Sequence, residues 1–273
     1  MADGLKTFSA LDIIDRAKSR AASFVESAGH EKTGTSDLLI GIDFGTTYTG
    51  VAFAFSSSVG PQKTAPRTLA EAEAIIEKVV VVKNWPSVVQ LPADKTPTVL
   101  AYGHGELVAW GGKVKPSHRT QIAHFKLGLQ DNIGRHYGNE SATANSLLGG
   151  FLRNSNWRHQ ALPTKKAVDY TTDYLTEVRK YVIETFLPRH YGKTFLNGQQ
   201  ISYTLTVPAI WTDKAKELTR KAAVDTGIPS NKLALITEPE AAALYCATTC
   251  TEVDLRDGDR FLVCDAGGGT VVI

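Results

Sequence analysis

Cysteine is scarce in this 273-residue chain, and its scarcity excludes whole classes of protein. The three cysteines are Cys246, Cys250 and Cys264, and such an odd, sparse count suits a reducing compartment rather than a disulfide framework. Neither they nor the seven histidines show the spacing of a zinc site. We therefore expect no zinc, and we expect Cys246 and Cys250 to be small core residues.

Charge of one sign and long apolar runs are also scarce. The net charge is +2, and no run of lysine or arginine stands out, so we expect neither a nucleic-acid nor an anionic-membrane partner. No apolar stretch approaches the ~18 residues of a membrane-spanning helix. With 42% apolar and 21% charged residues, the composition is that of a globular protein.

The first residues include Asp3 and have no continuous apolar core, so they do not resemble a secretory signal. We expect a cytoplasmic protein, and the sequence leaves the nucleus open as a second compartment. A mitochondrial transit peptide is the alternative. It is favoured by Arg16, Ser19, Arg20 and Ser23, and opposed by the acidic residues Asp12, Asp15 and Glu26.

Strand-like and helix-like periodicities alternate along the chain, which predicts an α/β layered sheet. An N-terminal helix over 9–28 and a linker to residue 37 precede it, and a weakly patterned stretch indicates a small inserted subdomain, roughly 84–165. Thr212 is the expected N-cap of one helix and Gly227 its expected stop. We expect strands at 38–56 (a pair), 79–82, 98–102, 200–207, 233–236 and 260–264, and helices at 69–78, 167–187, 213–226 and from 238 onward.

One short pattern occurs twice, 222 residues apart: IGIDFGTTYTGVA around Asp43 and FLVCDAGGGTVVI around Asp265. Each copy is an apolar strand, an Asp, a turn rich in glycine or threonine, and a second apolar strand. Backbone N–H groups in such a turn bind phosphate, and a carboxylate beside phosphate needs a cation, most simply Mg²⁺. An ordinary hairpin explains one copy equally well, but two copies with Asp at the same place favour a grip on one polyphosphate.

A third segment, ITEPEAAALY, places Glu238 at a strand-to-helix junction, from which a carboxylate can project toward a ligand. A helix N-terminus with favourable acidic residues explains this segment by itself. Its position between the two Asp turns favours the ligand instead.

In chain order, IGIDFGTTYTGVA, ITEPEAAALY and DAGGGT resemble the heat-shock 70-kDa (Hsp70) branch of the actin-like ATPase superfamily, which has a ribonuclease H-like fold. TVPAIWTDKAKELTRKAAVDTGI, residues 206–228, strengthens the resemblance and is most similar to a divergent Hsp70-like group, the heat-shock 70-kDa protein 12 type and related fungal proteins. The resemblance covers residues ~38–273. It implies a first lobe over 38–259 and the start of a second lobe over 260–273.

The resemblance also implies a set of nucleotide contacts. Asp43 and Asp265 would hold Mg²⁺ through water, and Glu238 would orient the attacking water or complete the metal shell. The family uses a lysine near the γ-phosphate, for which Lys113 is the best match; Lys115 lies two residues away, and a solvated surface lysine is the alternative. The phosphate turns would supply Gly45, Thr46, Thr47 and the adjacent Tyr48 on one side, and Gly267, Gly268, Gly269 and Thr270, which would face the γ-phosphate, on the other.

The chain departs from the family pattern in two places. The family's interdomain switch pairs the proline of Val-Pro-Ala, here Pro208, with a downstream arginine, but the matching position is Lys216. Lysine cannot make bidentate contacts, which puts coupling to a partner domain in doubt. The sequence also stops at Ile273, before the family's adenosine-binding segments, so we expect this chain to bind ATP poorly.

The resemblance thus implies Mg²⁺-dependent binding and hydrolysis of ATP to ADP. The expected site residues are consistent with this activity, because phosphoryl transfer needs mainly positioning and charge neutralisation. Client polypeptides or co-chaperones are the partners it implies for the complete protein. Two alternatives stay open: a sugar or acid kinase of the same superfamily, and a nucleotide-sensing or vestigial scaffold without turnover.

Overall fold

The computed structural model describes residues 37–55, 79–88, 93–130, 165–249, 262–266 and 271–272. The helices expected over 9–28 and 69–78, with the linker to residue 37, lie outside the described residues, as do residues 131–164 of the expected inserted subdomain. Gly267, Gly268, Gly269 and Thr270 of the second turn also lie outside them.

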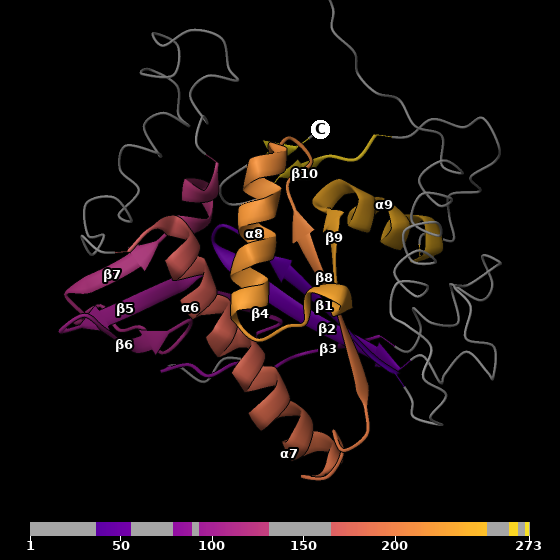
Figure 1. Ribbon diagram of the computed structural model, residues 1–273, viewed down its shortest axis with the longest axis horizontal. Coiled ribbons are helices and arrows are strands. Elements are labelled where there is room, and N and C mark those ends of the chain that lie inside the picture. The colour runs from indigo at the N-terminus through magenta and orange to yellow at the C-terminus, as the bar shows by residue number, and fades with distance from the viewer. Residues whose placement is uncertain are drawn as a thin grey trace, which may run out of the picture.

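A mixed β-sheet forms the centre of the fold (Figure 1), with strands in the order β3-β2-β1-β8-β9 and β4 also paired with β2. β1 and β2 are antiparallel, whereas β1, β8 and β9 run parallel. The expected strand pair over 38–56 is confirmed, as are the strands at 200–207 and near 79–82 and 233–236. The strands are β1 (Asp37–Phe44), β2 (Tyr48–Phe55), β3 (Val80–Val81), β4 (Lys95–Pro97), β8 (Gln200–Val207) and β9 (Leu233–Thr237).

The long helix expected over 167–187 is confirmed and continues four residues further. It comprises α6 (Ala167–Lys180), a π-helical segment η3 (Tyr181–Phe186) and α7 (Leu187–Tyr191). The wide turn comes just before Pro188, which lacks an N–H group and whose ring crowds the carbonyl of the preceding turn. Gly192, at φ 95°, ends the helix.

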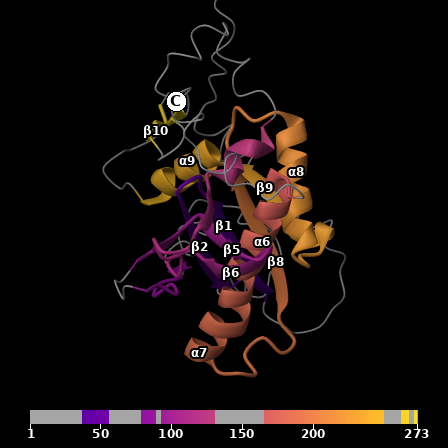
Figure 2. The same cartoon turned by 90° about the vertical axis from the view of Figure 1, so that its left-hand side faces the viewer.

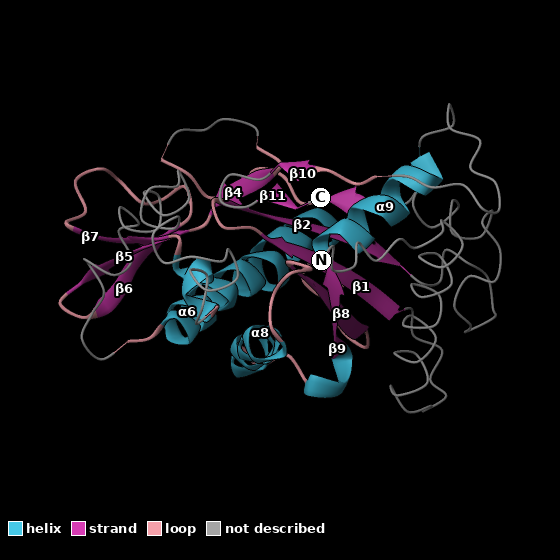
Figure 3. Ribbon diagram, turned by 90° about the horizontal axis from the view of Figure 1, so that it is seen from above, coloured by secondary structure: helices cyan, strands magenta, loops and turns pink. Residues whose placement is uncertain are grey.

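The next two helices begin at their expected residues. α8 (Asp213–Asp225) starts after Thr212, whose hydroxyl accepts a hydrogen bond from the Ala215 N–H at 3.3 Å. α9 (Glu238–Thr249) follows β9, with a short 3₁₀ turn η4 (Ser230–Lys232) before that strand. Figure 3 shows α6 and α8 on one face of the sheet and α9 on the opposite side.

A smaller sheet lies beside α6, on the side of the molecule that faces the viewer in Figure 2. Its order is β6-β5-β7, with β5 at Val99–Gly103, β6 at Glu106–Trp110 and β7 at Thr120–Ala123. It continues into a 3₁₀ helix, η2 (Phe125–Leu129). All of this falls within the expected inserted subdomain, whose boundaries stay a prediction.

The alternation of β1 sorts its side chains between the core and the opposite face. Leu38, Ile40, Ile42 and Phe44 are buried, and the Phe44 ring lies 6.1 Å from that of Tyr174 on α6. Because successive side chains of a strand point to opposite faces, Asp43 is directed away from this aromatic core.

Two expectations were wrong. Leu262–Cys264 is not a strand; the strand there is β10 (Asp265–Ala266), which pairs with β11 (Val271–Val272), so Asp265 lies inside the strand, as Asp43 does. Cys246, expected in the core, is exposed, because α9 runs outward from β9, the edge strand of the described sheet (Figure 1). Cys264 is exposed too, whereas Cys250 lies outside the described residues.

No helix in the described ranges combines the length and apolar character needed to cross a membrane.

Candidate functional site

The carboxyl ends of the three parallel strands meet at one edge of the main sheet. β1 pairs with β8 up to Ile42↔Leu205, and β8 pairs with β9 up to Val207↔Thr237. The residues that follow at this edge are therefore neighbours, although they are far apart in sequence. Such an edge is where open α/β sheets bind ligands.

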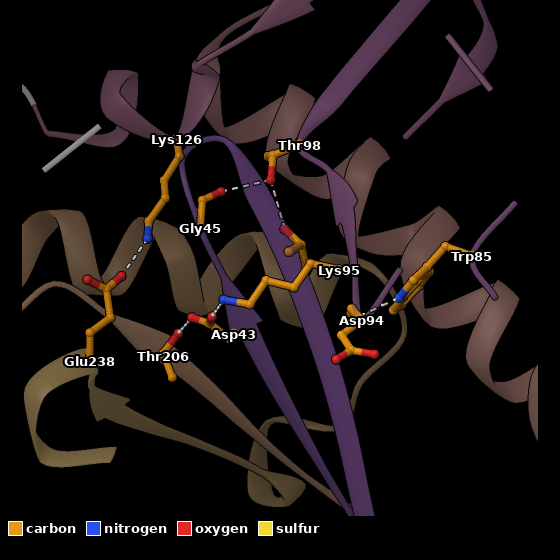
Figure 4. Close-up of polar contacts among 10 residues, drawn as sticks. Asp43, Gly45, Trp85, Asp94, Lys95, Thr98, Lys126, Thr206 and Glu238 are labelled. Carbon is orange, nitrogen blue, oxygen red and sulfur yellow. Dashed lines mark hydrogen bonds and ion pairs between the residues drawn. The ribbon is translucent and has the colours of Figure 1, made fainter. Parts of the chain in front are cut away.

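Asp43 is held at this edge from two directions (Figure 4). Its Oδ1 accepts a hydrogen bond from the Thr206 hydroxyl at 3.0 Å, and its Oδ2 lies 2.7 Å from Lys95 Nζ. The side chains of Lys95 and Asp43 are 53% and 44% exposed, so this ion pair faces solvent. Both oxygens of the carboxylate thus have a protein partner.

The turn after β1 is tightly built. A Cβ on Gly45 would lie 2.2 Å from the Tyr48 carbonyl oxygen, so only glycine fits there. Thr98 holds the turn from behind: its hydroxyl donates to the Gly45 carbonyl at 2.8 Å and its N–H to the Thr47 carbonyl at 2.8 Å.

This anchoring sets the direction of the N–H groups in the turn. In a trans peptide, the C=O group and the following N–H group point to opposite sides. The Gly45 and Thr47 carbonyls point at Thr98, so the N–H groups of Thr46 and Tyr48 point away from it. Figure 4 places Lys126 and Glu238 across Gly45 from Thr98. Outward N–H groups on a tight turn are suited to bind an anion.

A buried ion pair lies at the same edge. Lys126 Nζ of η2 lies 2.7 Å from Glu238 Oε1 at the start of α9, with the two side chains 2% and 12% exposed. The ammonium also lies 5.4 Å from the Phe44 ring centre and 5.5 Å from that of Trp211. Cation–π attraction from both rings offsets part of the cost of burying the charge.

Such a pair is not explained by stability alone, because an apolar pair of similar volume is usually as stable or more so. The surroundings nevertheless hold it in one geometry. Gln130, at the end of η2, accepts hydrogen bonds from the N–H and hydroxyl of Thr212 at 3.3 and 3.2 Å. The Thr237 hydroxyl accepts from the Glu240 N–H at 3.3 Å and fixes the start of α9.

The second hairpin repeats the register of the first. Asp43 pairs with Gly50 and Asp265 with Val272, while Phe44 pairs with Thr49 and Ala266 with Val271. The two Asp residues therefore occupy the same place in two equal hairpins. Figure 1 shows β10 beyond the carboxyl ends of β8 and β9, at the edge that carries Glu238.

The structure brings some expected site residues together and leaves others apart. Thr46 is buried, Thr47 is half-buried and Tyr48 is 55% exposed, all at the first turn. Lys113 is exposed in the turn after β6, where its N–H donates to the Trp110 carbonyl. Lys126, not Lys113, lies at Glu238.

The two residues of the expected interdomain switch lie near each other in sequence but are not joined. Pro208 is buried at the end of β8, and its carbonyl accepts from the Trp211 N–H. Lys216 is half-buried in the first turn of α8. Among the described contacts, no hydrogen bond or ion pair connects them.

The sequence did not predict four residues that contribute to this site: Lys95, Thr98, Lys126 and Thr206. A detectable signal existed for Lys126, which is a lone charge between Phe125, Leu127 and Leu129 in an apolar stretch. Lys95 and Thr98 gave no such signal, because their roles depend on which strands pair.

The donor set fits a phosphate chain better than it fits a metal bound by protein alone. Within the described ranges, no group of three or more His, Cys, Asp or Glu side chains gathers that could hold a metal ion. Mg²⁺ commonly keeps several waters and is held by one or two carboxylates together with phosphate oxygens. Asp43 with a bound polyphosphate meets that requirement.

Parts of the chain are similar to known heat-shock proteins, although no family model matches it. A stretch of 59 residues is 41% identical to heat shock 70 kDa protein 12A of Homo sapiens, covering 20% of this chain and 9% of that protein. Over 83 residues the chain is 35% identical to chaperone protein DnaK 3 of Synechococcus, covering 30% and 12%. Over 77 residues it is 36% identical to a heat shock protein homologue of Encephalitozoon cuniculi, covering 28% and 11%.

Each match spans about a tenth of the relative's length. The likeness supports an Hsp70-like family, without reaching any one branch of it.

Proposed function

We propose that this chain carries the first lobe, over 38–259, and the start of the second lobe, over 260–273, of an Mg²⁺-dependent ATP-binding and ATP-hydrolysing domain of the Hsp70 kind. The actin-like ATPase fold and closeness to the heat-shock 70-kDa protein 12 type are part of this proposal. A chaperone role, with client polypeptides or co-chaperones as partners, would belong to the whole protein, and we place it in the cytoplasm.

The observation that carries the proposal is the convergence at one sheet edge. A carboxylate (Asp43), a tight turn with outward N–H groups (after Gly45) and a buried ammonium–carboxylate pair (Lys126 and Glu238) come from three separate segments of the chain. These are the parts that phosphoryl transfer requires, namely anion binding, charge neutralisation and a group that orients the nucleophile. An ordinary hairpin would not require the buried ion pair beside it, and an ordinary helix N-terminus would not require the carboxylate and the tight turn.

Within this site we assign Lys126 the γ-phosphate role that the sequence reasoning gave to Lys113. Lys126 is buried and paired with Glu238, whereas Lys113 is exposed. Glu238, held near the ammonium, would accept a hydrogen bond from the attacking water and orient it. Asp43 and Asp265 would hold Mg²⁺, which when bound neutralises charge on the phosphate oxygens.

The second turn would supply the remaining phosphate contacts. Gly267, Gly268 and Gly269 would wrap the other side of the phosphates, and Thr270 would face the γ-phosphate. The equal registers around Asp43 and Asp265 support this assignment.

The test is equilibrium dialysis of radiolabelled ATP against the 273-residue chain, followed by phosphate release with Mg²⁺ present. We expect ATP to bind weakly, and we expect Lys126→Met and Glu238→Gln each to lower any turnover by about 10²–10³. Lys221→Met is the matched control, because Lys221 also pairs with a carboxylate, that of Asp225 at 2.6 Å, but on the exposed face of α8.

Each outcome separates one reading from the others. Binding with turnover supports an ATPase, and binding with no turnover in any variant supports the nucleotide-sensing scaffold. Turnover that appears only when a sugar or an organic acid is added supports the kinase. No ATP binding at millimolar concentration would overturn the proposal.

A further inference from the structure

Three residues on neighbouring strands lie side by side across the first hairpin. Gly50 of β2 pairs with Asp43 of β1 on one side and with Lys95 of β4 on the other. The glycine therefore lies directly between the ammonium-bearing and the carboxylate-bearing strands. Lys95 spans this distance, and its Nζ lies 2.7 Å from Asp43 Oδ2.

The missing side chain of Gly50 makes the reach possible. A Cβ on Gly50 would lie 3.2 Å from Cγ, 3.4 Å from Cε and 3.6 Å from Cδ of Lys95. The aliphatic stem of Lys95 thus lies across the backbone of Gly50. Gly41, on the adjacent strand β1, has no such neighbour, because a Cβ there would meet only the Ala52 carbonyl oxygen at 3.9 Å.

The ammonium stands where a metal would be needed. Asp43 is the described carboxylate of the proposed Mg²⁺ site, and Lys95 already supplies it with a positive charge. A lysine ammonium is a compact point charge that also binds phosphate. It can therefore neutralise both the carboxylate and a phosphate oxygen without a metal.

We propose that Lys95 is a built-in cation at Asp43, which takes over part of the charge neutralisation by Mg²⁺ and makes ATP binding weakly dependent on the metal. This inference rests on the proposed function. It has a second consequence: a divalent ion at Asp43 must either displace Lys95 or tolerate a like charge at close range, and both weaken its binding.

The effects of removing Lys95 are therefore opposite for the two ligands. In Lys95→Met, ATP without metal should bind less tightly, because the phosphate loses a cation. A divalent ion without nucleotide should bind more tightly, because a competitor for Asp43 is gone. General damage to the fold would weaken both.

The experiment measures ATP affinity of the 273-residue chain by equilibrium dialysis in EDTA and in excess MgCl₂, at constant ionic strength. We expect wild-type affinity to change by less than about threefold between the two conditions, and that of Lys95→Met by about tenfold or more. Binding of Mn²⁺ alone, followed by the electron paramagnetic resonance of the free ion, should be tighter in Lys95→Met.

Two matched pairs control the experiment. Lys83→Met removes another exposed lysine that pairs with a carboxylate, Asp94 at 3.3 Å, and should leave the Mg²⁺ dependence unchanged. Gly50→Ala pushes the stem of Lys95 without removing its charge, and should increase the Mg²⁺ dependence, whereas Gly41→Ala should not.

An equal Mg²⁺ dependence in wild type and Lys95→Met, or weaker Mn²⁺ binding in Lys95→Met, would overturn the role of Lys95 and leave the proposed function standing. Failure of every variant, wild type included, to bind ATP would overturn the proposed function and this inference with it.

Discussion

Two lysine–carboxylate pairs flank the same turn, with equal N–O distances of 2.7 Å and opposite surroundings. The pair of Lys126 and Glu238 is buried between two aromatic rings, whereas that of Lys95 and Asp43 faces solvent. Separating a buried pair leaves an uncompensated charge in a dry site at a large cost in free energy, whereas an exposed charge exchanges partners readily. The first pair is thus built to stay in place, and the second to respond to ions.

Breaking the buried pair should have the largest effect. Lys126→Met leaves a carboxylate without its partner in a dry site, and we expect the free energy of unfolding in urea to fall by about 3–5 kcal/mol. The double variant Lys126→Met with Glu238→Met should recover most of that loss. If Lys126→Met lowered the free energy of unfolding no more than Lys95→Met does, the distinction between the two pairs would be removed.

The turn between the two pairs comes next. Gly45→Ala forces a Cβ against the Tyr48 carbonyl oxygen, and we expect a loss of about 1–3 kcal/mol by the same urea titration. Gly41→Ala, which has room for a Cβ, should cost clearly less. Equal losses in the two variants would mean that the turn adapts more freely than its contacts indicate.

The two pairs should also differ in how strongly salt weakens the coupling free energy between lysine and carboxylate. A double-mutant cycle on Lys95 and Asp43 should give a coupling of about 0.2–1 kcal/mol in 0.1 M NaCl, and at 1 M NaCl it should vanish because exposed charges are screened. The cycle on Lys126 and Glu238 should keep most of its coupling at both concentrations. A salt-insensitive coupling for Lys95 and Asp43 would contradict the responsive role given to that pair.

The smallest effect concerns His124, the residue before η2, two positions from Lys126. Burial lowers the pKa of His124, so below its unfolded pKa of about 6.5 the unfolded chain binds the proton more readily than the folded one. Stability should therefore decline as the pH falls from 7 toward the lower folded pKa. In His124→Asn this part of the decline should be absent, because the amide does not titrate. Asn also tolerates the local φ of 61°, so the substitution should not strain the backbone. An unchanged pH profile in the variant would assign the decline to other groups.

Local signals predicted much of the fold and part of the site. The alternation of β8 and the Thr212 cap of α8 are written in consecutive residues, and both were found at the expected positions. Lys95 acts through the pairing of β4 with β2, and Lys126 through contact with a helix 112 residues away. Such contacts depend on tertiary packing, which periodicity does not encode.

The strand expected over 260–264 shows the complementary error. Its apolar run suggested an ordered strand, but Leu262 is 69% exposed and pairing begins only at Asp265. An apolar run becomes a strand only where a partner strand completes its hydrogen bonds. β1 has a partner strand on each side, β2 and β8, which is why the first copy matched its expected bounds more closely.

Thr98 is the single residue between β4 of the main sheet and β5 of the small one, and its two hydrogen bonds to the turn have a mechanical consequence. A displacement of the small sheet pulls on the carbonyls of Gly45 and Thr47, and their peptide planes turn with them. The position of the small sheet and the orientation of the turn are therefore mechanically coupled, and they change together for as long as both hydrogen bonds hold.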